Sequence, residues 1–151
     1  MAEHNNNSLV PYLCAKGAAD AIDFYKKAFG ATEVWRMAGP DGKVMHADMK
    51  IGDLPFMISD EFPEHGAVSP HTLGGAAVML ALTVDDVDAI FAQAVAAGAT
   101  VQKPVALQFY GHRTGYVLDP FGYRWGISTV VEKLTPEEMQ ARATKLFGGN
   151  Q

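Results

Sequence analysis

Apolar residues recur at helical spacing in two segments of the chain, residues 18–29 and 86–97. In both segments they return every three or four positions, which gathers them on one face of an α-helix. A glycine follows each segment, Gly30 after the first and Gly98 after the second, where the end of a helix favours a left-handed residue. The pattern predicts two amphipathic helices.

The predicted helices lie within a duplicated stretch of sequence. Residues 19–32, ADAIDFYKKAFGAT, align without a gap with residues 87–100, VDAIFAQAVAAGAT, at an offset of 68. Seven of the fourteen aligned positions are identical, including the final Gly-Ala-Thr. A gap-free repeat indicates two copies of one structural unit, which we place at residues 8–60 and 76–130.

Each copy also carries the pattern of β-strands. One strand is predicted before each helix, at 8–15 and at 76–84, and three strands follow each helix. Those three are predicted at 31–38, 43–51 and 54–59 in the first copy and at 100–107, 113–118 and 123–129 in the second. The predicted fold class is therefore α+β, with two βαβββ repeats in a single domain over residues 8–130.

The two ends of the chain fall outside this domain. We expect residues 1–7 to be a disordered tail and residues 131–151 to be a helical extension. In the extension, Thr135 is suited to cap the helix and Pro136 to occupy its first position. We expect this helix to pack on the body of the protein or on a second subunit.

Charge and composition exclude several functional classes. The net charge of -5 argues against a nucleic-acid partner, because phosphate binding needs a basic surface. No apolar run approaches the ~18 residues of a membrane helix, and the N-terminal segment lacks the apolar core of a signal peptide. The single cysteine, Cys14, excludes an internal disulfide and is expected to be buried rather than nucleophilic. We expect a cytoplasmic protein without a membrane partner.

The paired units, with AIDFYKKAFGA in the first and VDDVDAIFAQAVAAGA in the second, resemble the vicinal oxygen chelate superfamily. That superfamily includes glyoxalase I, extradiol dioxygenases and the bleomycin- and fosfomycin-resistance proteins. The resemblance extends from Val10 to Thr129, and the segments DGKVMHADMKIGD and QFYGHRTGYVLDPFGYRW look like its PhnB-like branch. It implies an eight-stranded open cup that encloses a small-molecule site.

The resemblance also implies where a divalent metal would bind. In this superfamily four His, Glu or Gln side chains hold the metal, from the first and last strands of each unit. The matching positions here are Pro11 and Met79 on the first strands and Met57 and Gly126 on the last. None offers a hard oxygen or nitrogen ligand. We therefore expect no metal cofactor at these positions, although a divalent metal elsewhere stays open.

Strand alternation selects candidate residues on the inner face of the cup. It places His46 and Asp48 opposite an apolar face formed by Met45, Ala47, Met49 and Ile51. His46 is the candidate catalytic residue, as a general base, and the alternative is a structural histidine. Asp48 either orients His46 or is solvated, and the solvated interpretation is preferred.

The remaining candidates are predicted to bind the substrate. The segment LQFYGHRTGY, residues 107–116, is expected to be a lid that presents Arg113 to an anionic or oxygen-rich ligand. Alternatively, Arg113 pairs with Asp119 or Glu61. The full predicted set is Met57, Ser59, Met79, Gln108, Tyr110, Arg113 and Trp125.

Two functional hypotheses follow. The preferred one, because the metal ligands are missing, is a metal-independent protein that binds a small molecule. The alternative is an enzyme of the lyase, isomerase or transferase type that uses His46, Gln108 and Arg113, with or without a displaced metal. In both cases we expect a homodimer, since a partner subunit often completes the cup in this superfamily. The apolar residues Met139, Leu146 and Phe147 of the C-terminal helix favour the same assembly.

Overall fold

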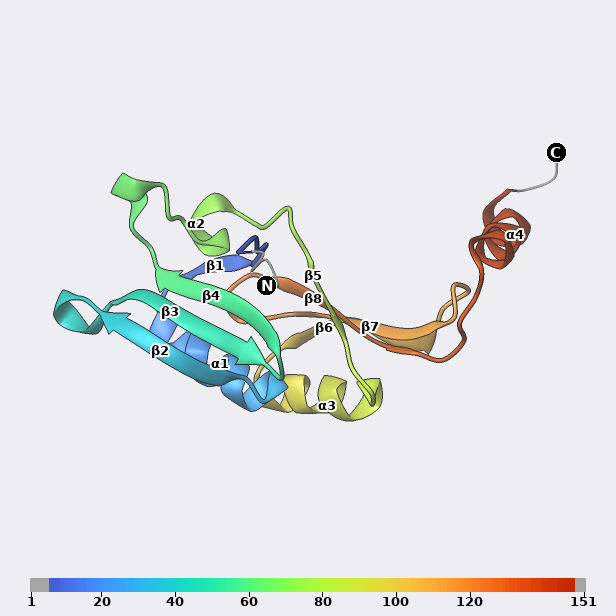
Figure 1. Ribbon diagram of the computed structural model, residues 1–151, viewed down its shortest axis with the longest axis horizontal. Coiled ribbons are helices and arrows are strands. Elements are labelled where there is room, and N and C mark those ends of the chain that lie inside the picture. The colour runs from blue at the N-terminus through green and yellow to red at the C-terminus, as the bar shows by residue number, and fades with distance from the viewer. Residues whose placement is uncertain (1–5, 149–151) are drawn as a thin grey trace, which may run out of the picture.

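The computed structural model describes residues 6–148 and contains both βαβββ units (Figure 1). The first unit consists of β1 (Tyr12–Ala15), α1 (Ala18–Phe29), β2 (Thr32–Ala38), β3 (Val44–Ile51) and β4 (Leu54–Asp60). The second consists of β5 (Leu80–Thr83), α3 (Val87–Ala97), β6 (Thr100–Leu107), β7 (His112–Leu118) and β8 (Arg124–Val130). A short helix, α2 (Pro70–Leu73), lies between the units, and α4 (Pro136–Phe147) follows the second. The predicted order of elements is confirmed.

The structure describes only part of the two chain ends for which predictions were made. Residues 1–5 of the expected tail and residues 149–151 of the expected extension lie outside the described range. The predicted C-terminal helix is α4, in which Pro136 is the first residue and the Thr135 hydroxyl accepts a hydrogen bond from the Glu138 N–H. Within residues 6–148, no helix is long and apolar enough to cross a membrane.

Each unit forms its own four-stranded sheet with the same topology. The strand orders are β1-β4-β3-β2 and β5-β8-β7-β6. In both sheets the first and last strands of the unit are parallel, and the other neighbours are antiparallel. Helix α1 covers one face of the first sheet, α3 covers one face of the second, and the two helices pack together (Figure 1). The α+β class and the duplication are confirmed.

The strand pairing corrects the offset between the two units. Leu13 pairs with Ile58 in the first sheet, Leu82 pairs with Ile127 in the second, and all four side chains are buried. Equivalent residues in these strands are therefore 69 positions apart, not 68. The offset falls from 69 to 68 across the helix because α1 has 12 residues and α3 has 11. It returns to 69 at the last strand because the turn before β8 is longer than the turn before β4.

A buried aspartate caps the first helix. The Asp60 carboxylate accepts hydrogen bonds from the backbone N–H groups of Gly17 and Ala18, at 3.2 and 2.9 Å. These donors have no partner within the helix, so the carboxylate satisfies them. As predicted, α1 ends at Gly30 in the left-handed conformation. Asp86 caps α3 in the usual way, through the N–H of Ala89 at 3.1 Å.

A second buried carboxylate, that of Asp119, joins the two units. One of its oxygens accepts hydrogen bonds from the Tyr25 hydroxyl of α1 at 2.5 Å and from the Trp125 indole N–H at 2.9 Å. The other accepts the backbone N–H groups of Phe121 and Tyr123. The turn at residues 119–122 therefore closes around a side chain that also reaches the first unit.

The predicted apolar face of β3 is wrong at one position. Ala47 and Met49 are buried as expected, but Met45 is 44% exposed and Val44 is fully buried. The pairing with β2 shifts here, because Met37 pairs with His46 while the next residue of β2 pairs with Val44. Met45 is thus the extra residue of a β-bulge, which reverses the alternation of faces.

Tyr25 generates a prediction about stability in alkaline solution. Burial, followed by the nearby Asp119 charge, raises the pKa of Tyr25 well above its usual value of 10.0. The folded-state pKa then exceeds the unfolded-state pKa, so this contribution to stability is complete below about pH 10 and is lost as the pH rises further. We expect Tyr25→Phe to lower the unfolding free energy by about 1–3 kcal/mol at neutral pH, because Asp119 loses a donor.

The same variant should lose less additional stability than the wild type between about pH 9 and pH 11, because it lacks the group that ionises on unfolding. Urea unfolding followed by circular dichroism at several pH values measures both effects. An identical alkaline decline in the two proteins would contradict this role of Tyr25.

Candidate functional site

Polar and aromatic side chains gather on the face of the first sheet opposite α1. Strand pairing places Tyr12 beside Met57, and Met57 beside Asp48. Asp48 in turn lies beside Trp35, so one row crosses all four strands. We call this surface the open face, and its side chains are Tyr12, Trp35, His46, Asp48, Met57 and Ser59.

His46 lies at the centre of a hydrogen-bonded chain on the open face. Its Nδ1 is 2.7 Å from the Tyr12 hydroxyl, and its Nε2 is 3.0 Å from one oxygen of Asp48. The Trp35 indole N–H donates to the other oxygen of Asp48. Hydrogen bonds from Trp35 and then His46 lower the pKa of Asp48. Asp48 therefore orients His46, and the preferred interpretation of it as a solvated residue was wrong.

The two aromatic residues of this chain are half exposed. Tyr12 is 51% and Trp35 is 48% exposed, and each ring centroid lies 5.4 Å from that of His46. Partial burial raises the pKa of Tyr12, with smaller effects from its neighbours. Neither residue was predicted from the sequence. Alternation on strand 8–15 would have identified Tyr12 only if the face covered by α1 had been known.

A groove of about 580 Å³ borders the open face at Tyr12 and Ser59. Its outer wall is the segment from Phe62 to Ala67, which belongs to the connection between the units, and Met45 of the bulge also lines it. Ser59 is almost fully buried and its hydroxyl donates to the backbone carbonyl of Asp60. The polar group of the open face that is accessible at this groove is thus the Tyr12 hydroxyl.

Cys14 follows Tyr12 on β1 but takes no part in this arrangement. It is 8% exposed, as expected for a buried residue. Burial, with smaller contributions from the charges of Glu61 and Asp60, raises the pKa of its thiol to about 11. A thiol with this pKa is almost entirely protonated at neutral pH, so Cys14 is a poor nucleophile.

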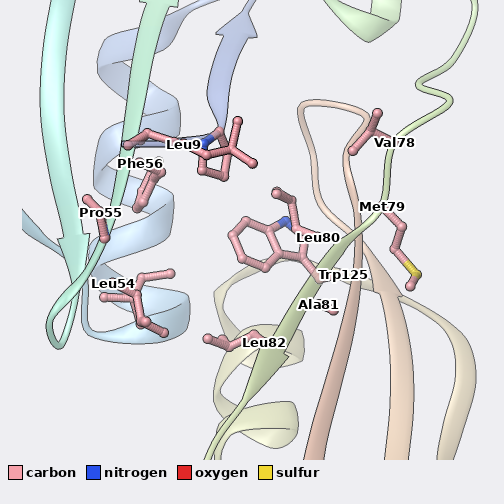
Figure 2. A pocket seen from close by; sticks show the side chains of 13 residues that line it. Leu9, Leu54, Pro55, Phe56, Val78, Met79, Leu80, Ala81, Leu82 and Trp125 are labelled. Carbon is pink, nitrogen blue, oxygen red and sulfur yellow. The ribbon is translucent and has the colours of Figure 1, made fainter. Parts of the chain in front are cut away.

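A separate cleft of about 490 Å³ lies between the two units, and all its lining residues are apolar. Figure 2 shows Leu54 and Phe56 of β4 on one side and Leu80 and Leu82 of β5 on the other. The predicted residues Met79 and Trp125 line this cleft. Trp125 is 4% exposed, so it is chiefly a core residue whose edge reaches the cavity.

The expected lid over residues 107–116 is instead a tight turn between β6 and β7. The turn is closed by a hydrogen bond from the N–H of Gly111 to the carbonyl of Gln108, at 3.1 Å. Arg113 lies within β7 and pairs with Asp88 of α3 through two hydrogen bonds of 2.9 and 2.8 Å. Arg113 therefore points to the helix side of the sheet, and neither of its predicted ion-pair partners was correct.

The structure divides the predicted site residues into three groups. His46, Met57 and Ser59 share the open face of the first sheet, as predicted. Met79 and Trp125 line the apolar cleft. Gln108 and Tyr110 flank Phe109 in the turn that contacts α4, and Arg113 pairs with Asp88 of α3. A single chain thus does not bring His46, Gln108 and Arg113 together.

The divalent metal expected for such a fold does not fit the residues present. Pro11 and Met79 precede their strands, and the residues that pair with Met57 and Gly126 are Tyr12 and Ala81. The first-strand positions assigned from the superfamily were therefore displaced, by one residue at Pro11 and by two at Met79. A side chain at Gly126 would meet the Tyr116 ring at 3.1 Å and the Met79 methyl at 3.4 Å. Within residues 6–148, no group of three or more His, Cys, Asp or Glu residues could hold a metal.

Comparison with known proteins agrees with this fold. A family model described as the Glyoxalase/Bleomycin resistance protein/Dioxygenase superfamily matches residues 8–127. The chain belongs to this superfamily. Its members commonly bind small molecules and are often dimeric.

Individual relatives span most of this chain. The protein Mb0911c of Mycobacterium bovis is 43% identical over 144 residues, which cover 93% of this chain and 95% of the relative. The structure of the Arabidopsis thaliana product At5g48480 is 28% identical, covers 81% of this chain and 98% of its own, and has a TM-score of 0.66. A Bacillus cereus structure titled as a PhnB protein and putative 3-demethylubiquinone-9 3-methyltransferase is 21% identical, with coverages of 82% and 99% and a TM-score of 0.63. At that identity the likeness shows the fold alone.

The absence of suitable donors predicts how the protein responds to metal ions. A site occupied at a metal concentration about 100-fold above its Kd would raise the Tm of a chain of this size by roughly 5–10 °C. We expect Zn²⁺ and Ni²⁺ to cause no such shift in the wild-type protein. The measurement is a thermal scan with each metal, with and without EDTA. A stoichiometric stabilisation that EDTA reverses would mean that a displaced metal site exists.

Proposed function

We propose that the protein binds a small planar molecule on the open face of the first sheet, without the divalent metal of its superfamily. The observation that supports this most directly is the position of two half-exposed aromatic rings, Tyr12 and Trp35, on either side of the oriented imidazole of His46. Exposed rings beside a few polar groups are typical of surfaces that a ligand covers.

The size and chemistry of the groove support the same assignment. Its volume of about 580 Å³ is in the range of small-molecule pockets, and it opens beside the Tyr12 hydroxyl. Met45 provides an adaptable apolar contact in the groove, and Met57 of the open face provides another in a separate hollow. The cleft between the units has comparable volume but offers no polar side chain to orient a ligand.

The assembly we propose is a cytoplasmic homodimer in which α4 packs on a second copy of the chain. None of the residues of α4 is buried, and Leu146 and Phe147 are 60% and 74% exposed. The helix stands away from both sheets (Figure 1). It is held by Arg142, which pairs with Glu132 and donates to the Phe109 carbonyl, and by an edge contact between the Phe147 and Phe109 rings. A protruding helix with an uncovered apolar end is suited to a partner of the same fold.

Trp35 provides a direct test of ligand binding. It is the exposed tryptophan, whereas Trp125 is buried, so a planar molecule on the open face should quench the fluorescence of Trp35 selectively. We expect 4-nitroanisole to quench the wild-type protein in a saturable manner and to leave Trp35→Phe unaffected. Met57→Lys should weaken binding about tenfold or more, because it places a charge among the contacts.

A matched variant distinguishes the two cavities. Val78 lines the apolar cleft and is largely exposed, so Val78→Lys changes that cavity with little effect on the core. We expect this variant to bind 4-nitroanisole as the wild type does. Loss of binding in Val78→Lys but not in Met57→Lys would move the site to the cleft between the units.

The dimer is tested by changing only the exposed end of α4. Light scattering at micromolar concentration should give twice the 16.2 kDa mass of one chain. We expect the double variant Leu146→Ser with Phe147→Ser to shift the population towards monomer, because each loses apolar contact area. Lys145→Gln on the same turn is the control and should remain dimeric. A wild-type protein that is monomeric throughout would contradict the proposed assembly.

A further inference from the structure

Both ring nitrogens of His46 are already engaged within the first sheet. Nδ1 lies 2.7 Å from the Tyr12 hydroxyl, and Nε2 lies 3.0 Å from Asp48. The His46 side chain is only 18% exposed, whereas Tyr12 is 51% exposed and borders the groove. A molecule on the open face therefore meets the Tyr12 oxygen before it can reach a nitrogen of His46.

The chemistry of Asp48 sets the direction of these hydrogen bonds. A carboxylate can only accept, so Nε2 of His46 carries the hydrogen that bonds to Asp48. In the neutral imidazole, Nδ1 then has a free lone pair and accepts the hydrogen of the Tyr12 hydroxyl. Trp35 donates to the second oxygen of Asp48 and fixes the carboxylate. The Tyr12 oxygen keeps the capacity to accept a hydrogen bond, and Tyr12 lines the groove.

The second unit shows that the sheet folds without this chain of hydrogen bonds. Tyr12 pairs with Met57, which pairs with Asp48, and the equivalent row of the second sheet contains Ala81, Gly126 and Tyr116. The residue equivalent to His46 is Thr114, two positions before Tyr116. Because the same topology forms with these other residues, the chain from Tyr12 to Asp48 is not required to build the sheet.

We propose that Tyr12 is the residue that exchanges a proton with the bound molecule and that His46 receives the proton of Tyr12. The molecule is then a planar compound with a weakly acidic hydroxyl, such as a phenol or an enol. This inference rests on the binding surface proposed above and specifies the chemical class of its ligand. Tyr12 touches the ligand, whereas Asp48 is a positioning residue that acts through His46.

The proton transfer is balanced without a further reactant. The ligand hydroxyl gives its proton to the Tyr12 oxygen while the original Tyr12 proton moves to Nδ1 of His46. The products are a ligand oxyanion, hydrogen-bonded to the neutral Tyr12 hydroxyl, and an imidazolium paired with the Asp48 carboxylate. Only O–H and N–H bonds are exchanged, and nothing is oxidised or reduced. Asp48 stabilises the charge that forms on His46.

Two probes of nearly the same shape test this inference. 4-Nitrophenol has an acidic hydroxyl and its ionised form absorbs visible light, whereas 4-nitroanisole has a methyl ether in the same position and cannot ionise. We expect both probes to quench Trp35. The wild-type protein should also raise the ratio of ionised to neutral 4-nitrophenol about tenfold in the bound probe, relative to free solution at the same pH.

Nitrogen NMR of His46 provides a readout that a purely structural role would not change. In the free protein we expect hydrogen on Nε2 and a bare Nδ1. Addition of 4-nitrophenol, but not of 4-nitroanisole, should protonate Nδ1. In Tyr12→Phe, 4-nitrophenol at a concentration that saturates Trp35 quenching should no longer protonate Nδ1 of His46, because the hydroxyl that passes the proton is missing. Asp48→Asn should lower the ratio of ionised to neutral bound 4-nitrophenol, because the imidazolium of His46 loses its charged partner.

The outcomes separate the two proposals. If both probes bind but 4-nitrophenol is not ionised, the proton transfer is wrong and the binding surface stands. If hydrogen is found on Nδ1 of His46 in the free protein, the proton transfer is wrong whatever binds. If neither probe quenches Trp35, the binding surface and the ligand class both fail. If Tyr12→Phe weakens the binding of 4-nitrophenol and of 4-nitroanisole equally, Tyr12 has a structural role.

Discussion

The buried carboxylate of Asp119 is the interaction on which the arrangement of the two units depends. It accepts hydrogen bonds from Tyr25 of the first unit and from Trp125 and two backbone N–H groups of the second. A buried charge is tolerated only when its oxygens are fully satisfied, so the carboxylate requires all these donors to be in place. This fixes α1 against the second unit. With α1 committed to one face of the first sheet, the opposite face is left open for a ligand.

The duplicated units have diverged at the positions that this arrangement leaves uncovered. The same strand register presents Tyr12 and Asp48 in the first sheet and Ala81 and Tyr116 in the second. At the position where the superfamily would place a ligand on the last strand of the second unit, Tyr116 and Met79 fill the space beside Gly126. The two sheets thus share one topology but present different side chains at equivalent positions.

The proposed role of His46 follows from its surroundings rather than from its residue type alone. A free imidazole on a strand could act directly as a base, but here Asp48 and Tyr12 occupy both nitrogens. The consequence is that the exposed hydroxyl of Tyr12, and not the ring of His46, forms the chemical surface of the site. The apolar cleft between the units offers no such group.

The sequence by itself determined the order of elements, the duplication and the lack of hard ligands at Pro11, Met57, Met79 and Gly126, because these depend on local periodicity, on capping residues such as Gly30 and on residue type. It also placed His46, Met57 and Ser59 on one face, since alternation holds within a regular strand. It could not find the bulge at Met45 or the one-residue change of offset, because a small difference in helix or turn length leaves the pattern intact. Only the tertiary structure decided that Arg113 faces α3 and that Tyr12 reaches His46, because both depend on contacts between strands and helices distant in sequence.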